Sequence, residues 1–262
     1  MTSVVELQEK AYRVLDDLCS TLSDEEWDRP TDCPGWSVKD NLAHITGTES
    51  MLLGRPAPSH EVGSKPWVKN PPGTANEVQV DYRRSWTPQQ VLDEFREVYA
   101  ERTKILDALT EPDLDAESWT PIGPGKLRDL LAIRIMDCWV HEQDIRRAVG
   151  KPGGLDGPIA EHAFGRHAQA MPFIVGKKVA PPEGTRIVFD VDGRRLGVEM
   201  RSPRAVRAED LEHPDVTLSM DLETFNRLSC GRGENADVGR AVHIEGDEEL
   251  GRKVIASMNF MI

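Results

Sequence analysis

The hydrophobic and polar positions of the first half of the chain repeat with the period of an α-helix. Between residues 6 and 22, apolar side chains recur at positions 11, 14, 15, 18 and 22, on one face of a predicted helix. A second helix is predicted from Ser37 to about Leu53, where Ser37-Val-Lys-Asp40 matches a capping box. A third begins near Thr87-Pro88 and runs to Leu109, since proline is favoured at an early helical position.

The fourth predicted helix is the most apolar stretch of the chain. It begins at Leu127, after the Pro/Gly cluster of residues 121–125, and ends at Gly150 with Pro152 just beyond, which is a typical stop signal. Four helices of this length predict a helical bundle, and bundles commonly build metal sites from facing helices. Residues 54–82 hold several Pro and Gly and few apolar side chains, so a long loop is predicted there.

The pattern changes after Gly153-Gly154. Residues 158–171 are predicted to form a connecting helix, and Arg186–Val191 and Arg194–Met200 a hairpin around Asp192-Gly193. Strands at 216–220 and 241–245, each followed by a helix, complete a smaller α+β domain with a mainly antiparallel sheet. The predicted fold class is therefore α+β in two domains: a four-helix bundle over residues 1–153 and the α+β domain over 154–262.

The composition and net charge of the chain argue against some classes of binding partner. The chain has 262 residues, 39% hydrophobic and 29% charged, which is ordinary for a soluble globular protein. The net charge of −13 argues against a nucleic acid or an anionic membrane surface as partner. No apolar run reaches the roughly 18 residues that cross a bilayer, and no secretory leader is recognised at the N-terminus, so a cytoplasmic location is expected. The oligomeric state is left open.

The cysteines also indicate a reducing compartment. The four of them are scattered, with no C-x-x-C pair, which is typical of reduced thiols rather than of disulfides or a zinc knuckle: Cys19, Cys33, Cys138 and Cys230.

One polar stripe interrupts the apolar fourth helix. Asp137 and His141 are four residues apart, so on a helix their side chains lie on the same face, one turn apart. Arg134 and Asp144 extend this stripe by a turn at each end. Burying such a stripe is costly unless its members are paired or bound to metal. A carboxylate and an imidazole in this arrangement can bind one divalent cation, so the stripe predicts part of a metal site.

The second predicted helix supplies the best third ligand. His44 lies four residues after Asp40, whose carboxylate can orient the imidazole. His44, Asp137 and His141 form a set of two histidines and one carboxylate, which leaves coordination positions open for water or thiolate. Zn²⁺ is the metal expected, with Ni²⁺ or Fe²⁺ as alternatives.

Other interpretations of the same residues need no metal. A core histidine bonded to a backbone carbonyl explains His44 alone, and a buried ion network with Arg134 and Arg146 explains Asp137 and His141. The D-x-x-x-H spacing is also frequent by chance. The metal hypothesis is favoured because all three candidate ligands fall in strongly apolar helices.

Two motifs resemble one known family. Asp32-Cys-Pro-Gly-Trp-Ser-Val-Lys-Asp-Asn-Leu-Ala-His44 resembles the C-P-G-W-[ST]-V-x-D-x-x-x-H signature of the mycothiol-dependent maleylpyruvate isomerase family, within the DinB-like superfamily. Arg134-x-x-Asp137-x-x-x-His141-x-x-Asp144 is similar to the R-x-x-E-x-x-x-H-x-x-D helix of that family. The resemblance covers about residues 1–150 and implies a four-helix bundle with a central metal. Carried over by motif, the ligands are His44, Asp137 and His141.

The resemblance includes one departure and one extension. Asp137 stands where the isomerases usually have Glu, and it is one methylene shorter, so helix spacing or metal position must differ slightly. The second half, with Asp215-Val-Thr-Leu-Ser and Val242-His-Ile-Glu-Gly-Asp247, is similar to the sterol-carrier-like domain that many members of the family carry. Because one scaffold hosts many chemistries, membership of the family says little about the substrate.

The resemblance implies a metal-dependent enzyme that activates a low-molecular-weight thiol, mycothiol, for S-transfer or isomerisation of a small electrophilic substrate. Metal coordination lowers the pKa of a thiol, so that a thiolate forms at neutral pH and attacks an electrophilic carbon. Arg134 and Asp144 are the candidate residues that brace the ligands. Arg232, in Leu-Ser-Cys-Gly-Arg232, is the candidate contact for an anionic substrate.

Two alternative functions compete with this hypothesis. The first is a metal-dependent hydrolase that uses metal-bound water, and assays of thiol consumption against ester or amide hydrolysis separate it from the thiol hypothesis. The second is a non-catalytic protein that binds a structural metal and an apolar ligand.

Overall fold

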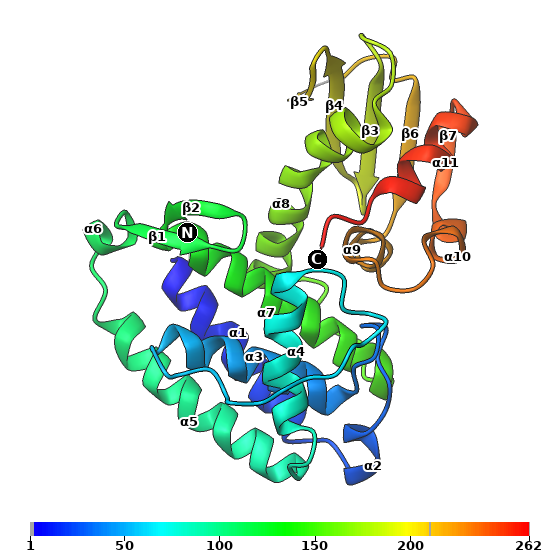
Figure 1. Ribbon diagram of the computed structural model, residues 1–262. Coiled ribbons are helices and arrows are strands. Elements are labelled where there is room, and N and C mark those ends of the chain that lie inside the picture. Colours follow the sequence, from blue (N-terminus) through cyan, green and yellow to red (C-terminus); the bar gives the residue numbers. More distant parts are fainter. Residues whose placement is uncertain (1–2, 210, 262) are drawn as a thin grey trace. The chain divides into compact units, whose positions relative to one another are not determined.

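The chain forms two units of different composition, a helical one and one built on a sheet (Figure 1). The computed structural model describes residues 3–209 and 211–261. The first unit ends at Ala163 and the second runs from Phe164 to Met261. The α+β class and the two-domain organisation predicted from the sequence are confirmed. The predicted boundary at residue 153 lies in the connection between two helices, and it stays a prediction.

The four predicted helices of the bundle are all present. They are α1 (Val4–Cys19), α3 (Val38–Leu52), α5 (Pro88–Asp107) and α7 (Leu127–Val149). α1 packs against α5 and α7, and α3 packs against the same two helices, so the four enclose one core. Its largest fully buried side chains come from all four helices: Tyr12, Leu15, Leu42, Ile45, Phe95, Leu106, Leu131, Ile135 and Trp139. α7 ends at Gly150, whose φ of 68° is the left-handed conformation that glycine allows at a helix C-terminus.

The predicted long loop of residues 54–82 contains a helix, so that prediction is wrong in part. α4 (Pro71–Arg83) begins after the N-cap Asn70, whose side chain accepts the Gly73 N–H at 2.8 Å, and it packs against α3. Its buried face carries Glu77 and Arg83 beside Val80, and both charged side chains are paired inside the protein. A helix that buries charged residues lacks the apolar stripe by which sequence patterns are recognised.

Shorter elements connect the bundle helices. Two of them are single helical turns, α2 (Asp24–Trp27) and α6 (Glu111–Leu114). The Pro/Gly cluster before α7 forms a hairpin of β1 (Glu117–Thr120) and β2 (Gly123–Lys126). A further helix, α8 (Gly157–Phe173), contains the boundary between the two units.

The second unit is built on a five-stranded sheet in the order β5-β4-β3-β6-β7. β3 pairs with β6 in parallel and the other three pairings are antiparallel, so the predicted mainly antiparallel sheet is confirmed. The β3–β4 turn has Asp192 at φ 50° and Gly193 at φ 80°, the two positive values of a type I′ hairpin. The strand β5 was not predicted. The strands are β3 (Arg186–Val191), β4 (Arg194–Arg201), β5 (Arg204–Ala208), β6 (Val216–Met220) and β7 (His243–Gly246).

Helices flank this sheet in the second unit. After α8 the chain makes one π-helical segment, Ile174–Val179, which packs against β4, β5 and α11. The helices are α9 (Leu222–Cys230), α10 (Asn235–Val238) and α11 (Glu248–Ser257), of which α11 packs on β6 and β7. The N-cap Asp221 of α9 and the N-cap Asp247 of α11 each accept a backbone N–H of the first turn.

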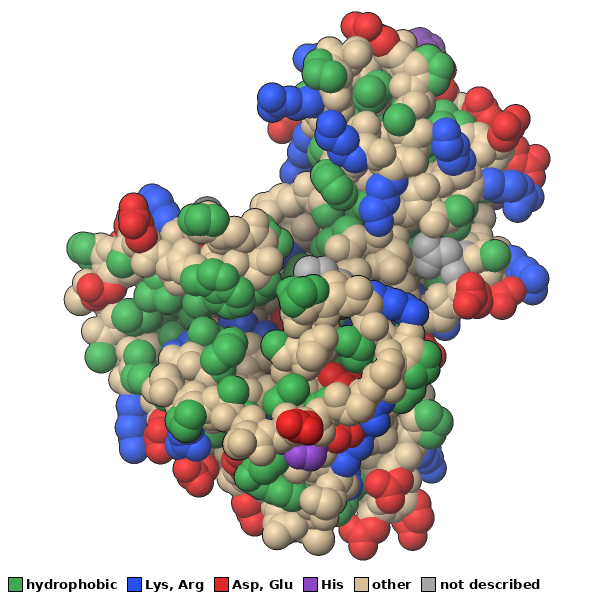
Figure 2. Space-filling model, in the orientation of Figure 1, with side chains coloured by type: hydrophobic (Ala, Val, Ile, Leu, Met, Phe, Trp, Pro, Cys, Tyr) green, Lys and Arg blue, Asp and Glu red, His purple; other side chains and the backbone are tan. Residues whose placement is uncertain are grey.

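The surface is mixed in character. Figure 2 shows basic and acidic side chains interspersed over the visible face, with hydrophobic side chains gathered on part of the helical unit. Large apolar side chains are exposed on the β1–β2 hairpin, where Trp119 is 62% and Ile122 is 79% accessible. Among the described residues, no helix has the length and apolar character to span a membrane.

Candidate metal centre

Two helices bring the three candidate ligands together. His44 lies in the middle of α3, and Asp137 and His141 lie one turn apart on α7, which packs against α3. His44 Nε2 is 3.2 Å from Asp137 Oδ2, and His141 Nε2 is 3.7 Å from Asp137 Oδ1. One ligand atom from each residue lies within 4.8 Å of the other two. The three side chains therefore converge on one point inside the bundle.

Burial and neighbouring charges set the protonation of these groups. Burial lowers the pKa of His44 below its usual value, although the nearby Asp137 carboxylate opposes the shift. Burial alone raises the pKa of Asp137, but Arg134 and His44 outweigh it and hold that pKa well below its usual range. A neutral imidazole beside an ionised carboxylate is the protonation pattern that metal ligation requires.

Arg134 is held between two buried carboxylates. Its Nη1 donates to Asp137 Oδ2, and its Nε donates to Glu49 Oε1 at 2.7 Å. The other oxygen of Glu49 accepts from Arg102 Nε at 2.9 Å, which extends the network to α5. All four side chains are buried or nearly so. The predicted contact between Arg134 and Asp137 is present, whereas Glu49 and Arg102 were not identified from the sequence.

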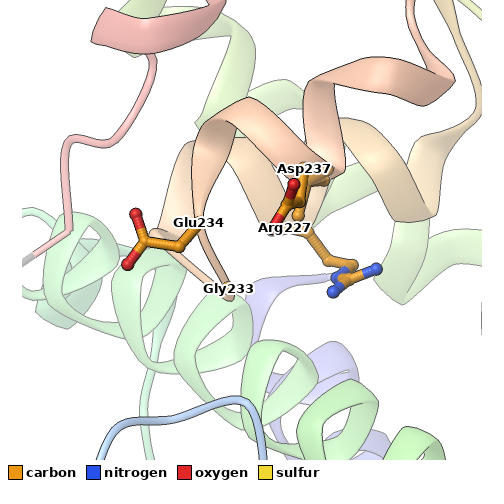
Figure 3. A pocket seen from close by; sticks show the side chains of 5 residues that line it. Arg227, Gly233, Glu234 and Asp237 are labelled. Carbon is orange, nitrogen blue, oxygen red and sulfur yellow. The ribbon is translucent and has the colours of Figure 1, made fainter.

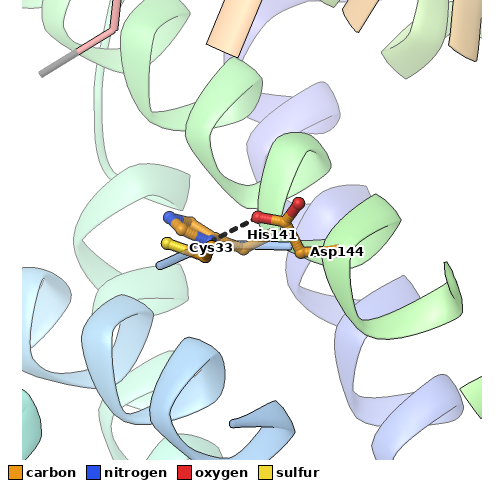
Figure 4. Close-up of side chains that lie close together, drawn as sticks. All are labelled: Cys33, His141 and Asp144. Carbon is orange, nitrogen blue, oxygen red and sulfur yellow. Dashed lines mark ion pairs between the residues drawn. The ribbon is translucent and has the colours of Figure 1, made fainter. Parts of the chain in front are cut away.

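The far side of His141 faces a second polar group. His141 Nδ1 is 2.6 Å from Asn41 Oδ1 and 3.3 Å from Asp144 Oδ2. Asp144 is itself paired with Arg147 on the next turn. Figure 4 shows the side chains of Cys33, His141 and Asp144 close together, and these three residues form a second group with ligand atoms within 4.8 Å of one another.

Asp40 has one of the two roles predicted for it, that of the capping box. Its Oδ2 accepts the N–H of Ser37 at 3.0 Å, its own N–H donates to Ser37 Oγ at 3.3 Å, and Arg84 lies 3.5 Å from its other oxygen. This carboxylate therefore closes the capping box of α3 and does not orient His44. Among the described residues, His44 Nδ1 has no hydrogen-bond partner.

An indole covers both histidines. The ring of Trp36 stacks on His141 with centroids 5.7 Å apart and lies 5.1 Å from His44. Its Nε1 donates to the buried Glu77 at 2.9 Å, and Trp67 Nε1 donates to the same oxygen at 3.1 Å. The turn before α3 and the helix α4 therefore close one side of the candidate centre with apolar surface.

We expect Gly35 to be essential for this cover. Gly35 and Gly54 both have φ of +77°, but a Cβ on Gly35 would lie 2.3 Å from the Trp67 ring, whereas Gly54 faces open space. Gly54→Ala should cost about 1–2 kcal/mol for the left-handed backbone, and Gly35→Ala about 1–3 kcal/mol more for the clash. Urea unfolding measures both. Equal losses in the two variants would contradict the packing described for Trp67.

The candidate residue of the second unit lies at the end of α9. Arg232 is buried, and its Nη1 donates to the carbonyl of Cys230 at 3.0 Å. A pocket of about 280 Å³ lies nearby in the same unit, lined by residues of α9, of α10 and of the segment between them (Figure 3). One basic residue, Arg227, and two acidic residues, Glu234 and Asp237, line this pocket, so it does not have the charge of an anion site. The role of Arg232 in substrate binding stays a prediction.

The residues of the bundle centre suit a divalent metal. They offer two imidazoles and one carboxylate, a set that leaves coordination positions open. The buried Nδ1 of His44 lacks a protein partner among the described residues, and the Asp137 carboxylate is kept ionised. Asp137 reaches both histidines in spite of being shorter than the Glu of the family motif.

A helical bundle with a two-histidine, one-carboxylate centre, followed by an α+β unit, defines the class of protein. The family model described as the mycothiol maleylpyruvate isomerase N-terminal domain matches residues 9–146, which is more than half of the chain. The chain belongs to this family. A second model, that of the SCP-2 sterol transfer family, matches residues 168–259. The family resemblance predicted for both halves from the sequence is therefore confirmed.

Solved structures support the same fold. The chain is similar to crystal structures of the mycothiol-dependent maleylpyruvate isomerase and of a mutant of that protein, with TM-scores of 0.61 and 0.59 at 18% and 17% identity. Each comparison covers 92% of this chain and 91% of the other. At this identity the likeness shows the fold.

Curated sequences give a partial match. Two uncharacterized proteins of Mycobacterium tuberculosis, from strains CDC 1551 / Oshkosh and ATCC 25618 / H37Rv, are each 26% identical over 141 residues. The match covers 52% of this chain and 52% of each relative, so the chain spans about half the length of the curated relatives it matches.

Proposed function

We propose that this protein is a metal-dependent enzyme that activates a low-molecular-weight thiol, mycothiol by family, for S-transfer to or isomerisation of a small electrophilic substrate. The observation that carries the proposal is the convergence of His44, Asp137 and His141 from α3 and α7. It occurs in a chain whose family is named for a mycothiol-dependent isomerase. The proposed domains are residues 1–153, which hold the centre, and 154–262.

Each residue of the centre has a distinct task in this proposal. His44, Asp137 and His141 would hold the metal, Zn²⁺ by expectation and Ni²⁺ or Fe²⁺ as alternatives, and the metal would lower the pKa of a thiol bound to it. Arg134 keeps Asp137 ionised and oriented. Trp36 shields both imidazoles from water on one side.

Two further residues are assigned on weaker contacts. Asp144 Oδ2 lies 3.3 Å from His141 Nδ1 and accepts its hydrogen, so it helps to hold the imidazole in position as a metal ligand. Arg232 is proposed to meet an anionic group of the substrate, because it supplies a buried guanidinium directly after Gly231, the C-cap of α9. The structurally similar isomerases are named for maleylpyruvate. The carboxylates of this compound are groups that a guanidinium binds.

Removal of the metal should abolish the thiol-dependent reaction. The purified protein is supplied with mycothiol and maleylpyruvate, and disappearance of the substrate is followed before and after dialysis against a chelator. We expect the rate to fall by at least about 100-fold, since thiolate formation at neutral pH depends on the metal, and to return on addition of Zn²⁺. A reaction that proceeds equally well without metal would refute the proposal. Turnover of activated esters that needs metal but no thiol would favour the hydrolase alternative.

A further inference from the structure

The two ring nitrogens of His141 face two different groups of potential ligands. Nε2 faces Asp137, on the side of His44, whereas Nδ1 faces Asn41 and Asp144. In a neutral imidazole one nitrogen carries a hydrogen and the other carries the lone pair that binds a metal. The tautomer of His141 therefore decides whether a metal can bind on the Asp137 side or on the Asp144 side of the ring.

The orientation of the Asn41 amide determines this tautomer. Asn41 Nδ2 is 2.8 Å from the carbonyl oxygen of Ser37 and 3.0 Å from Thr31 Oγ1. A backbone carbonyl only accepts hydrogen bonds, so the atom that faces Ser37 must be the NH₂ group. The amide oxygen then faces His141 Nδ1 at 2.6 Å, and this oxygen can only accept. His141 Nδ1 must be the donor.

The hydroxyl of Thr31 secures this orientation from the preceding turn. Its Oγ1 donates to the carbonyl oxygen of Trp36 at 2.9 Å and accepts the N–H of Cys33 at 3.2 Å. Because its single hydrogen is used on Trp36, Thr31 can act only as an acceptor toward Asn41. The turn that begins at Thr31 therefore holds the amide in place, and the amide holds the imidazole.

We propose that Asn41 is a positioning residue that accepts the Nδ1–H of His141 and so directs the Nε2 lone pair toward Asp137 and His44, with Thr31 fixing the amide. Asp144 Oδ2, at 3.3 Å, is a second and longer acceptor for the same hydrogen. His141 Nδ1 and Asp144 then cannot share a metal ion, because that nitrogen carries a hydrogen. The inference rests on the proposed function only for the identity of the metal ligands.

The tautomer itself can be measured without metal or substrate. Long-range ¹H–¹⁵N NMR of the metal-free protein at mildly alkaline pH distinguishes the two tautomers, and His141→Gln assigns the signals. We expect His141 to be protonated at Nδ1. The isosteric Asn41→Leu, which removes the acceptor, should raise the population protonated at Nε2. A wild-type His141 protonated at Nε2 would overturn the inference whether or not any variant folds.

Metal affinity gives an independent readout. In competition with a chromophoric chelator, Asn41→Leu should weaken Zn²⁺ binding by about 10- to 100-fold, the usual effect of removing such a support. Thr31→Val should have a smaller effect in the same direction. Thr46→Val is the matched control, since the Thr46 hydroxyl donates to the Leu42 carbonyl of its own helix at 2.8 Å. We expect no change in this control.

The variant Cys33→Ser tests which of the two groups of potential ligands binds the metal. Unchanged Zn²⁺ affinity in this variant supports the assignment, and a loss as large as that of His44→Ala would overturn it by placing the metal at the Cys33 group. Failure of the thiol reaction with an intact Nδ1–H tautomer would refute the proposed function and leave the role of Asn41 standing. The two conclusions can therefore fail separately.

Discussion

Replacement of Arg134 by leucine is expected to lower the free energy of unfolding of the metal-free protein by about 3–5 kcal/mol, the cost of removing one partner of a buried ion pair. Arg134 is buried and binds the carboxylates of Glu49 and Asp137. In the variant Glu49 keeps its second partner, Arg102, but Asp137 loses its guanidinium. Urea unfolding at neutral pH measures the loss.

Arg128 provides the matched control on the same helix. It pairs with Glu111 and Asp115 at the surface, where ion pairs contribute about 0–1 kcal/mol, so Arg128→Leu should change the stability little. Adding Asp137→Leu to Arg134→Leu should recover part of the loss, because it removes the carboxylate that is left without its guanidinium. Equal effects of the two arginine substitutions would contradict the buried network described here.

Substitution of either histidine by alanine is expected to weaken Zn²⁺ binding by about 100-fold or more. Zinc sites with four protein ligands bind Zn²⁺ with a free energy of about 10–16 kcal/mol at neutral pH. This is roughly 3 kcal/mol for each ligand, which corresponds to about 100-fold in affinity. The centre offers three ligands, so His44→Ala or His141→Ala leaves two. Chelator competition at fixed pH measures the change.

His60→Ala is the control for these substitutions. His60 pairs with Asp81 at 2.7 Å and does not belong to either group of potential ligands. Its removal should leave Zn²⁺ affinity unchanged. The same loss in His60→Ala as in His44→Ala would mean that the measured metal binds elsewhere.

The bundle was predictable because its four long helices carry recurring or near-continuous apolar residues and recognisable ends, such as the capping box of Ser37 and the left-handed Gly150. α4 was missed because its buried positions include Glu77 and Arg83, which are satisfied by residues of other elements. β5 was missed because only Ala205 of its Arg204-Ala-Val-Arg-Ala segment is buried, which gives no alternation of apolar and polar residues. In both cases tertiary contacts outweigh the local pattern.

The candidate centre was predictable only in part. The i, i+4 spacing of Asp137 and His141 places both on one helix face, and the motif adds His44 from the second helix. Spacing within a helix does not identify partners on another helix, so the contacts of Glu49 with Arg134 and of Asn41 with His141 were not foreseen. The capping box of Ser37 and Asp40 was predicted correctly, but the same carboxylate was also expected to orient His44, and its role in the cap occupies it instead.

The most direct test of the central claim is the metal content of the purified protein. Elemental analysis of the wild type is expected to give about one divalent metal ion per chain, as a single three-ligand centre requires, with a large loss in His44→Ala and in His141→Ala and none in His60→Ala. Full metal content in both His44→Ala and His141→Ala would contradict the assignment of this centre and the function proposed for it.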